Sequence, residues 1–289
     1  MPARTRLEAL VAMYPSMLVG YSGGVDSALL AVVARRTLGR DRAVAALGIS
    51  ASYSQAQYDQ ALAVARQFDL QVIEIPTGEL DDPNYVANAP SRCYFCKREL
   101  WGKLVTAARE RHLAIVADGT NADDLGEHRP GLRAAAEHQI RSPLAEAGYR
   151  KADVRAEARA LGIPIWNAPA APCLSSRIMY GLRVTPGRLR HVEAGEALLR
   201  ALGIEGDLRV RHRGDEARIE VQPSQFPRVR AHRERLATHF LESGFASVTL
   251  DLKGYRRSSL LVGAASQLEL LGESPSRSPA ASGALRGDA

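Results

Sequence analysis

The chain has 289 residues, a length that suits one large domain or two modest ones with a substantial hydrophobic core. Its hydrophobic content of 46% and charged content of 24% are ordinary for a globular protein. No apolar run approaches the roughly 20 residues that a membrane helix needs, and the N-terminus lacks the pattern of a signal peptide. We therefore expect a cytoplasmic protein with no membrane contact, whose three cysteines do not form disulfides.

The net charge of +6 comes from 38 basic and 32 acidic residues. Only four of the basic residues are lysines and alanine is abundant, which indicates a coding bias toward GC-rich codons. Scattered surface arginines are the simplest interpretation of this charge. Attraction to an anionic small molecule or nucleotide is the alternative.

Strand and helix patterns alternate from the N-terminus to about residue 165. After a short helix at 5–13, the expected strands are 17–21, 43–49, 71–75 and 114–117. The expected helices are 26–37, 54–68, 97–111 and 151–161. Strands separated by helices predict an α/β fold with a doubly wound parallel sheet, which binds ligands at the carboxyl ends of its strands.

The segment Tyr21–Ser27 lies between the first strand and the first helix of this sheet. Two glycines let the backbone curl so that successive N–H groups face one concavity, and the helix N-terminus adds partial positive charge. Such a loop binds phosphate, but it lacks the Gly-Lys-Ser/Thr of a Walker loop. Ser-Gly-Gly-x-Asp-Ser is instead typical of PP-loop ATP pyrophosphatases, which split ATP between its α and β phosphates. The candidate nucleotide ligands are Ser22, Gly23, Gly24, Asp26 and Ser27.

A second polar segment, Asp118–Asp124, directly follows the strand at 114–117. Glycine and small polar residues at a strand end can contact a sugar or phosphate, and acidic side chains can hold Mg²⁺. A capped turn that begins a helix is the alternative. Its pairing with the first loop in one sheet favours a nucleotide site, with Gly119, Thr120 and Asp123 as candidate ligands.

The alternation of strand and helix patterns stops at an irregular connector around residues 166–186. Beyond it the pattern predicts a small α+β domain, with helices at 187–202 and 227–243 and strands at 207–213, 217–222 and 246–252. We expect domains at 1–168 and 169–265. The remaining residues, 266–289, have few apolar anchors and are expected to be disordered.

All three cysteines stand in chemically suggestive places: Cys93 and Cys96 form a Cys-x-x-Cys at the start of a helical stretch, and Cys173 lies in the connector. A helix N-terminus favours the thiolate form. Three thiolates suit a 4Fe–4S cluster with one open iron, whereas structural zinc would need a fourth ligand. A single catalytic or sacrificial Cys173, zinc, and unrelated buried cysteines are the alternatives.

Arginines gather in the second domain. Arg209, Arg211 and Arg213 alternate along one expected strand and so share one face, and Arg256 follows the last strand. Guanidinium groups bind phosphate or carboxylate in bidentate fashion. The alternative is a solvated polar face on an edge strand.

In this order, these elements resemble the LarE family, ATP-dependent sulfur transferases of nickel-pincer cofactor biosynthesis, over about residues 5–265. The Cys-Leu-x-Ser-Arg segment is more specific than the loop, which many enzymes share. The resemblance rests on Ser22–Ser27, Asn88–Lys97, Asp118–Asp124, Ser142–Leu144, Cys173–Arg177, Arg209–Arg211 and Asp251–Arg256.

The resemblance implies a reaction, a substrate and a set of site residues. ATP would adenylylate a carboxylate of pyridinium-3,5-biscarboxylic acid mononucleotide, and a sulfur nucleophile would then displace AMP to leave a thiocarboxylate. One branch of the family consumes the sulfur of the cysteine that matches Cys173. Another carries sulfide on a 4Fe–4S cluster, and the three-cysteine pattern resembles that branch.

The same resemblance gives each residue a role and implies ATP, Mg²⁺ and the cluster as cofactors, in a homohexamer. The implied catalytic residues are Cys173, Asp26 and Ser27, and the implied cluster ligands are Cys93, Cys96 and Cys173. The implied substrate ligands are Arg177, Arg209, Arg211, Asp251 and Arg256.

Three other functions compete with this one. A tRNA thiolase with a three-cysteine cluster would suit the basic charge, but no RNA-binding module is visible and aromatic residues make up only 6%. We therefore do not expect a nucleic-acid partner. An amide-forming synthetase would leave the thiols unexplained, and a nucleotide- and cluster-binding sensor would bind ATP without releasing pyrophosphate.

Overall fold

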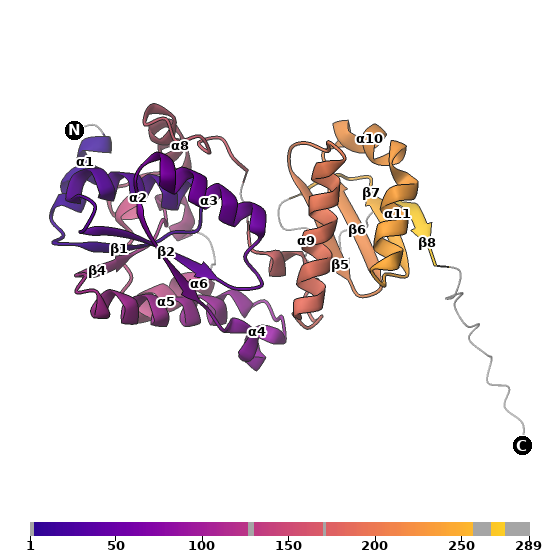
Figure 1. Ribbon diagram of the computed structural model, residues 1–289, viewed down its shortest axis with the longest axis horizontal. Coiled ribbons are helices and arrows are strands. Elements are labelled where there is room, and N and C mark those ends of the chain that lie inside the picture. Colours follow the sequence, from indigo (N-terminus) through magenta and orange to yellow (C-terminus); the bar gives the residue numbers. More distant parts are fainter. Residues whose placement is uncertain (1–2, 127–129, 170–171, 257–266, 275–289) are drawn as a thin grey trace, which may run out of the picture. The chain divides into compact units, whose positions relative to one another are not determined.

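The computed structural model describes residues 3–126, 130–169, 172–256 and 267–274. The chain divides into two compact units, which Figure 1 shows in colours that follow the sequence. The first unit comprises Met1–Ser176 and Arg183–Leu189, and the second comprises Arg177–Leu182 and Arg190–Ala289. The first unit thus extends beyond the boundary that we expected between residues 168 and 169.

The first unit holds a parallel sheet with strand order β3-β2-β1-β4. Its strands are β1 (Met17–Gly20), β2 (Ala43–Ile49), β3 (Gln71–Pro76) and β4 (Ile115–Ala117). Its helices are α1 (Ala3–Ala12), α2 (Val25–Leu38), α3 (Gln55–Gln67), α4 (Pro83–Val86), α5 (Arg92–Glu110), α6 (Pro130–Glu137), α7 (Pro143–Glu146) and α8 (Lys151–Ala160). Short 3-10 turns lie at Glu79–Asp81, Ala122–Gly126 and Leu174–Arg177.

Helices cover both faces of this sheet, with α2, α3 and α8 on one side and α5 and α6 on the other (Figure 1). Successive residues of a strand point to opposite faces. Met17 and Val19 therefore pack in the core that includes Leu29 of α2, and Leu18 packs with Trp101 of α5. Burial on both faces explains why the strands are almost continuously apolar. The predicted doubly wound α/β fold is confirmed.

Helix α5 begins at Arg92, five residues before the expected helix at 97–111, so that the Cys-x-x-Cys lies inside its first turns. The buried Arg92 guanidinium donates to the Asn88 side chain and, over 2.8 Å, to the carbonyl of Ser175. The Tyr85 hydroxyl lies 2.5 Å from Ser175 Oγ. These contacts hold the segment after Cys173 against the first unit, which accounts for its extension to Ser176.

The second unit is built on a mixed sheet with strand order β5-β6-β7-β8. Its strands are β5 (Leu208–Arg213), β6 (Glu216–Val221), β7 (Ser247–Asp251) and β8 (Leu268–Glu273). Its helices are α9 (Pro186–Ala201), which begins in the first unit, α10 (Phe226–Ala231) and α11 (Arg233–Glu242), with a 3-10 turn at Pro223–Gln225. The single helix expected at 227–243 is divided at His232. No helix in the described ranges is long and apolar enough to cross a membrane.

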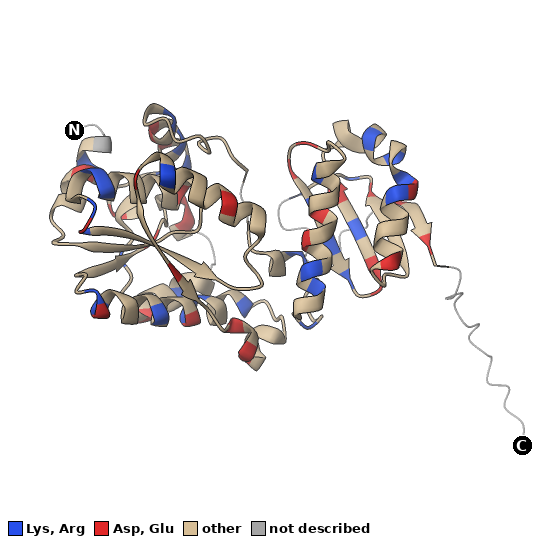
Figure 2. Ribbon diagram, in the orientation of Figure 1, with Lys and Arg blue, Asp and Glu red and all other residues tan. Residues whose placement is uncertain are grey.

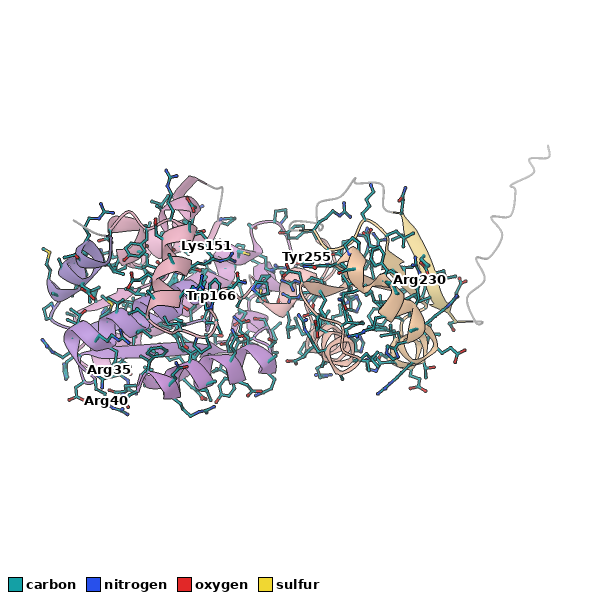
Figure 3. The ribbon with its side chains drawn as sticks, turned by 90° about the horizontal axis from the view of Figure 1, so that it is seen from above. Arg35, Arg40, Lys151, Trp166, Arg230 and Tyr255 are labelled. Carbon is teal, nitrogen blue, oxygen red and sulfur yellow. The ribbon has the colours of Figure 1, made fainter. Side chains whose placement is uncertain are left out.

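Strand β8 corrects the expectation of a disordered tail over residues 266–289. It pairs antiparallel with β7, and Glu269 forms an ion pair of 2.7 Å with Arg230 of α10, a residue labelled in Figure 3. Of its three leucines only Leu271 is buried, whereas Leu268 and Leu270 are exposed, so pairing with β7 contributes more to its placement than burial does. Residues 275–289 of the expected tail lie outside the described residues.

Candidate functional site

The loop after β1 is fixed by contacts from α3. Gly23 adopts a φ of +73°, and a Cβ there would lie 2.7 Å from the Cβ of Ala61, so both the turn and the close packing favour glycine. The Ser22 carbonyl accepts hydrogen bonds from Gln57 Nε2 at 2.8 Å and from the Tyr53 hydroxyl at 3.1 Å. The loop therefore has a defined conformation before any ligand binds.

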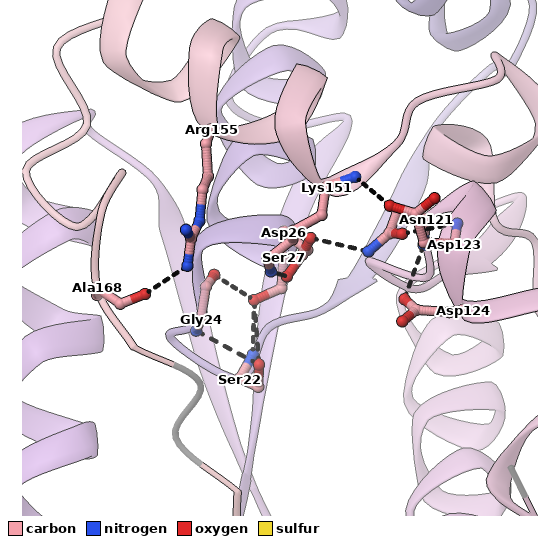
Figure 4. Close-up of polar contacts among 10 residues, drawn as sticks. All are labelled: Ser22, Gly24, Asp26, Ser27, Asn121, Asp123, Asp124, Lys151, Arg155 and Ala168. Carbon is pink, nitrogen blue, oxygen red and sulfur yellow. Dashed lines mark hydrogen bonds and ion pairs between the residues drawn. The ribbon is translucent and has the colours of Figure 1, made fainter. Parts of the chain in front are cut away.

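The serines of the loop close the turn into α2, as Figure 4 shows. Ser27 Oγ donates to the Gly24 carbonyl at 3.0 Å and accepts from the Ser22 amide at 3.2 Å. The predicted sequence of strand, glycine turn and helix start is confirmed here.

Asp26, in the first turn of α2, is bonded at both carboxylate oxygens (Figure 4). Oδ1 accepts from Asn121 Nδ2 at 3.2 Å, and Oδ2 forms an ion pair with Lys151 Nζ. The Lys151 amide in turn donates to Asp123 at 2.9 Å. These bonds join α2, the segment after β4 and the start of α8. Sequence reasoning missed Lys151, because nothing near it in the chain indicates that Asp26 is its partner.

The loops after β1 and β4 lie side by side because β1 pairs with β4. A Cβ on Gly119 would lie 2.7 Å from the Ser27 amide nitrogen, so glycine permits this close approach. Asp118 accepts from the Thr120 amide at 3.0 Å and from Ser142 Oγ at 2.8 Å. The capped turn that we considered as an alternative therefore exists, and it shapes the proposed ligand segment.

A cavity of about 420 Å³ lies between these two loops. The first loop contributes Ser22, Gly24, Asp26 and Ser27, and the second contributes Asp118, Gly119, Thr120 and Asp124. Of the residues that we expected, Gly23 and Asp123 do not line it, and Asp124 takes the place of Asp123. Two other depressions, of about 510 and 580 Å³, lie beside the edge strands β4 and β3 and contain none of these residues.

An adjoining cavity of about 130 Å³ is lined by Cys96 and Cys173. It shares Gly20, Ser22, Lys97 and Trp101 with the larger cavity, which is lined by Cys93. Cys173 is brought to the strand ends by the amide of Leu174, which donates to the Ser52 carbonyl at 2.8 Å. All three cysteines are thiols outside any disulfide, and each lines one of these two cavities.

The three thiols fit a 4Fe–4S cluster by their chemistry but are not gathered around one point. Two line the small cavity and Cys93 lines the larger one. In the described part of the chain, no group of three or more His, Cys, Asp or Glu side chains is placed to hold a metal ion. The lack of such a group does not argue against Mg²⁺ binding, because that ion usually takes one or two carboxylates and completes its shell with water and substrate phosphate.

Burial changes the chemistry of the small cavity. Desolvation, with added repulsion from Cys173 and Glu79, raises the pKa of the Cys96 thiol to about 12. Burial of Cys96 therefore opposes the thiolate form that we expected the helix N-terminus to favour. Sequence reasoning also missed Glu79, a buried carboxylate that accepts from Ser50 Oγ at 2.5 Å and Ser52 Oγ at 2.8 Å.

Two of the predicted arginines of the second unit, Arg177 and Arg211, are both buried and ion-paired. Arg209 and Arg211 are only 5% and 6% exposed, which argues against a solvated edge although β5 is an edge strand. Arg211 donates to Glu220 at 2.9 Å, and Arg177 donates to Glu196 at 2.9 Å. In the register of β5 and β6, Arg209 lies opposite Glu220 and Arg213 lies opposite Glu216. Basic and acidic residues therefore occur together in this unit (Figure 2).

Arg209 differs from its neighbours, because its guanidinium stacks on the Tyr255 ring at 5.1 Å. Burial, followed by the charge of Arg177, lowers the pKa of Arg209. Asp251, 1% exposed, accepts from Arg256 at 3.1 Å. The five predicted substrate ligands thus all lie in the second unit. Their partners Glu196 and Glu220 lie in no recognised motif, whereas Tyr255 lies within the Asp251–Arg256 segment.

Comparison with known proteins identifies the family. A sequence profile of the NAD synthase family matches residues 7–89. The chain is 35% identical to the pyridinium-3,5-bisthiocarboxylic acid mononucleotide synthase of Lactiplantibacillus plantarum, over 82% of this chain and 86% of that protein. The chain belongs to this synthase family, LarE. The aligned 238 residues exceed the length of either unit, so the LarE likeness spans both.

Other relatives of this LarE family member are similar over a comparable span. An uncharacterised protein of Synechocystis sp. is 42% identical over 84% of this chain and 91% of its own length. An uncharacterised protein of Methanocaldococcus jannaschii is 31% identical over 83% and 90%. Among solved structures, the NMN synthetase of Francisella tularensis has a TM-score of 0.46 at 17% identity, over 58% of this chain and 74% of that one.

Proposed function

We propose that this LarE family member is an ATP-dependent sulfur transferase that converts a carboxylate of pyridinium-3,5-biscarboxylic acid mononucleotide to a thiocarboxylate. The observation that carries the proposal is the shared wall of the two cavities. Ser22, which opens the phosphate-binding loop, lines both the large cavity and the cavity that contains Cys173. A nucleotide on the loop would therefore lie next to a sulfur-bearing side chain.

The first step would activate the carboxylate. A carboxylate oxygen attacks the α-phosphorus of ATP, the bond to the β-phosphate oxygen breaks, and pyrophosphate leaves. The Ser22–Ser27 loop would hold the pyrophosphate, with Mg²⁺ on Asp26 offsetting its charge. The mixed anhydride then offers AMP as a leaving group where the carboxylate offered only oxide.

The second step would exchange oxygen for sulfur. If Cys173 is the donor, its Sγ loses its proton and attacks the acyl carbon, and AMP leaves. Loss of the Cα proton to a base then forms the Cα=Cβ double bond and breaks the Cβ–Sγ bond, which releases the thiocarboxylate and leaves dehydroalanine. We propose instead that Cys93, Cys96 and Cys173 hold a 4Fe–4S cluster, which would supply sulfide without consuming a protein atom. The presence of all three thiols on adjoining cavities supports this assignment.

We also propose that Arg209 and Arg211 bind the substrate phosphate, with Arg177, Asp251 and Arg256 completing that site. The burial of Arg209 and Arg211, the ion pair of Arg211 with Glu220 and the contact of Arg209 with the Tyr255 ring support the assignment, since guanidinium groups held in place lose little entropy on binding. Assembly as a hexamer and a cytoplasmic location are further proposals, which rest on the family resemblance and on the sequence.

One assay tests the reaction. Purified protein with Mg²⁺, ATP and the dicarboxylate nucleotide should yield AMP, pyrophosphate and a product in which one oxygen is replaced by sulfur. ADP and phosphate as the only nucleotide products would reject the proposal. Arg209→Ala combined with Arg211→Ala should weaken binding of the substrate tenfold or more while leaving ATP binding nearly unchanged.

The sulfur source is tested separately. Protein purified without oxygen should contain about four irons per chain, and each Cys→Ala variant should lose them. Colourless protein after reconstitution, with Cys173 losing one sulfur during a single turnover, would instead support the sacrificial route.

A further inference from the structure

Lys97 and Trp101 lie one turn apart on α5 and line both cavities. They are therefore part of the wall that separates the phosphate-binding loop from Cys96 and Cys173. Lys97 ends the Asn88–Lys97 segment that carries the family resemblance, but no role was assigned to it or to Trp101, and the reaction described above leaves both unused.

The Lys97 side chain is held from two sides. Its Nζ lies 4.7 Å from the centre of the Trp101 ring, a cation–π contact. On the other side is α6, where a Cβ on Gly131 would lie 3.0 Å from Lys97 Cγ. Trp101 is itself only 2% exposed, and its ring packs on Gly20, where a Cβ would lie 2.8 Å away. The ammonium group is therefore positioned rather than free in solvent.

Lys97 also has no counterion within the described part of the chain. Among the residues that the structure describes, no hydrogen bond or ion pair reaches its ammonium group, which makes a cation–π contact with the Trp101 ring. The other two lysines of the first unit differ, since Lys103 pairs with Glu99 at 3.1 Å and Lys151 pairs with Asp26. A half-buried cation without an acidic partner gains most from a bound anion.

We propose that Lys97 binds the α-phosphate of the nucleotide, both in the acyl adenylate and in the departing AMP. This assignment rests on the proposed function. The β and γ phosphates would occupy the Ser22–Ser27 loop, so the α-phosphate is the one next to the thiol cavity. When sulfur attacks, the acyl carbon–oxygen bond breaks and AMP takes the electron pair. Lys97 stabilises that charge without giving up a proton, and Trp101 is a positioning residue.

The test compares Lys97→Met and Lys97→Arg in the full-length protein. A charge-assisted hydrogen bond contributes about 1.5–3 kcal/mol, so the methionine variant should bind AMP about ten- to a hundredfold more weakly. Binding of inorganic pyrophosphate should stay unchanged, since the loop holds it. The arginine variant should recover most of the AMP affinity. Lys103→Met, on the same helix, is the matched control and should leave both affinities unchanged.

Two further variants perturb the position of the charge without removing it. Gly131→Ala crowds the lysine stem and should weaken AMP binding severalfold. Trp101→Leu removes the aromatic face and should do the same, whereas Trp101→Phe should retain most of the affinity. Thermal melting shows whether each variant is folded, and a folded Gly131→Ala tests the assignment even if Lys97→Met does not fold.

Unchanged AMP affinity in folded Lys97→Met would overturn the assignment. An equal loss of AMP and pyrophosphate affinity would also overturn it, because Lys97 would then serve the whole loop. Failure of the proposed function would look different from failure of the Lys97 assignment. Wild-type protein would then make no AMP from ATP and the substrate. A comparison of AMP affinity between wild type and Lys97→Met would still test the assignment.

Discussion

The two units hold their candidate ligands in different ways. In the first, the ligands are backbone groups and short side chains on loops that follow parallel strands, fixed by neighbours such as Gln57 and Asn121. In the second they are mostly long arginine side chains that already have partners inside the protein, Arg211 with Glu220, Arg177 with Glu196 and Arg256 with Asp251. A ligand can therefore enter the first site with little rearrangement, whereas in the second it must share groups that also stabilise the fold.

This contrast predicts that substitutions separate chemistry from stability in the first unit and combine them in the second. Loop ligands contribute little to the core, so their loss should lower turnover while leaving the stability of the fold nearly unchanged. Buried ion pairs contribute little net stability when intact, but removal of one partner is costly. Four predictions test this difference, from the largest expected effect to the smallest.

The largest effect should come from Asp26→Asn. Loss of this charge at the cavity should lower AMP formation by about 10²–10³-fold, the usual cost of removing one electrostatic group from an active site. Because Asp26 is partly exposed, the melting temperature should change little. Asp123→Asn is the matched control, since Asp123 lies outside the cavity, and equal losses in the two variants would contradict the site as described.

In the second unit, Glu220→Gln should mainly reduce stability. It leaves the Arg211 guanidinium, 6% exposed, without its charge partner, which should cost about 3–5 kcal/mol of unfolding free energy. Arg213 pairs with Glu216 and is more exposed than Arg211. Arg213→Met should therefore lower the unfolding free energy by at most about 1 kcal/mol. Chemical denaturation measures both. Similar values would show that burial does not distinguish the two pairs.

The close approach of the two loops gives a third prediction. Gly119→Ala would place a Cβ 2.7 Å from the Ser27 amide, against backbone that cannot move aside easily. Such overpacking costs about 1–3 kcal/mol, and we expect ATP binding to weaken about tenfold. Gly126→Ala is the control because a Cβ there meets nothing within 4 Å. Calorimetric titration of ATP would contradict this packing if both variants bind like the wild type.

The contrast also explains what could be predicted from the sequence. The Ser22–Ser27 loop is recognisable because its function depends on local order: a buried strand, two glycines and a helix start. The parallel sheet follows from the same alternation. The arginines were recognisable as a group because a strand places every second residue on one face.

The missed features depend on contacts between distant segments or on weak local patterns. Lys151 contacts Asp26 across 125 residues, and Lys97 is set apart by a missing counterion and by Gly131 of another helix. Strand β8 has three leucines but only Leu271 is buried, and its backbone pairing with β7 has no signature in the sequence. Neither kind of feature has a spacing or composition that sequence reasoning can detect.

The smallest effect is expected at Lys151, which is labelled in Figures 3 and 4. Its ion pair with Asp26 is partly exposed, and such pairs contribute about 0.2–1 kcal/mol. Lys151→Met should therefore change ATP affinity by no more than about fivefold, less than the tenfold or greater loss of AMP affinity in Lys97→Met. The effect should shrink as salt is raised, because solvent screens exposed charges. Lys151→Arg should restore the pair. A loss as large as that of Asp26→Asn, insensitive to salt, would mean that Lys151 contacts the nucleotide directly, and that the first site, like the second, relies on a long charged side chain.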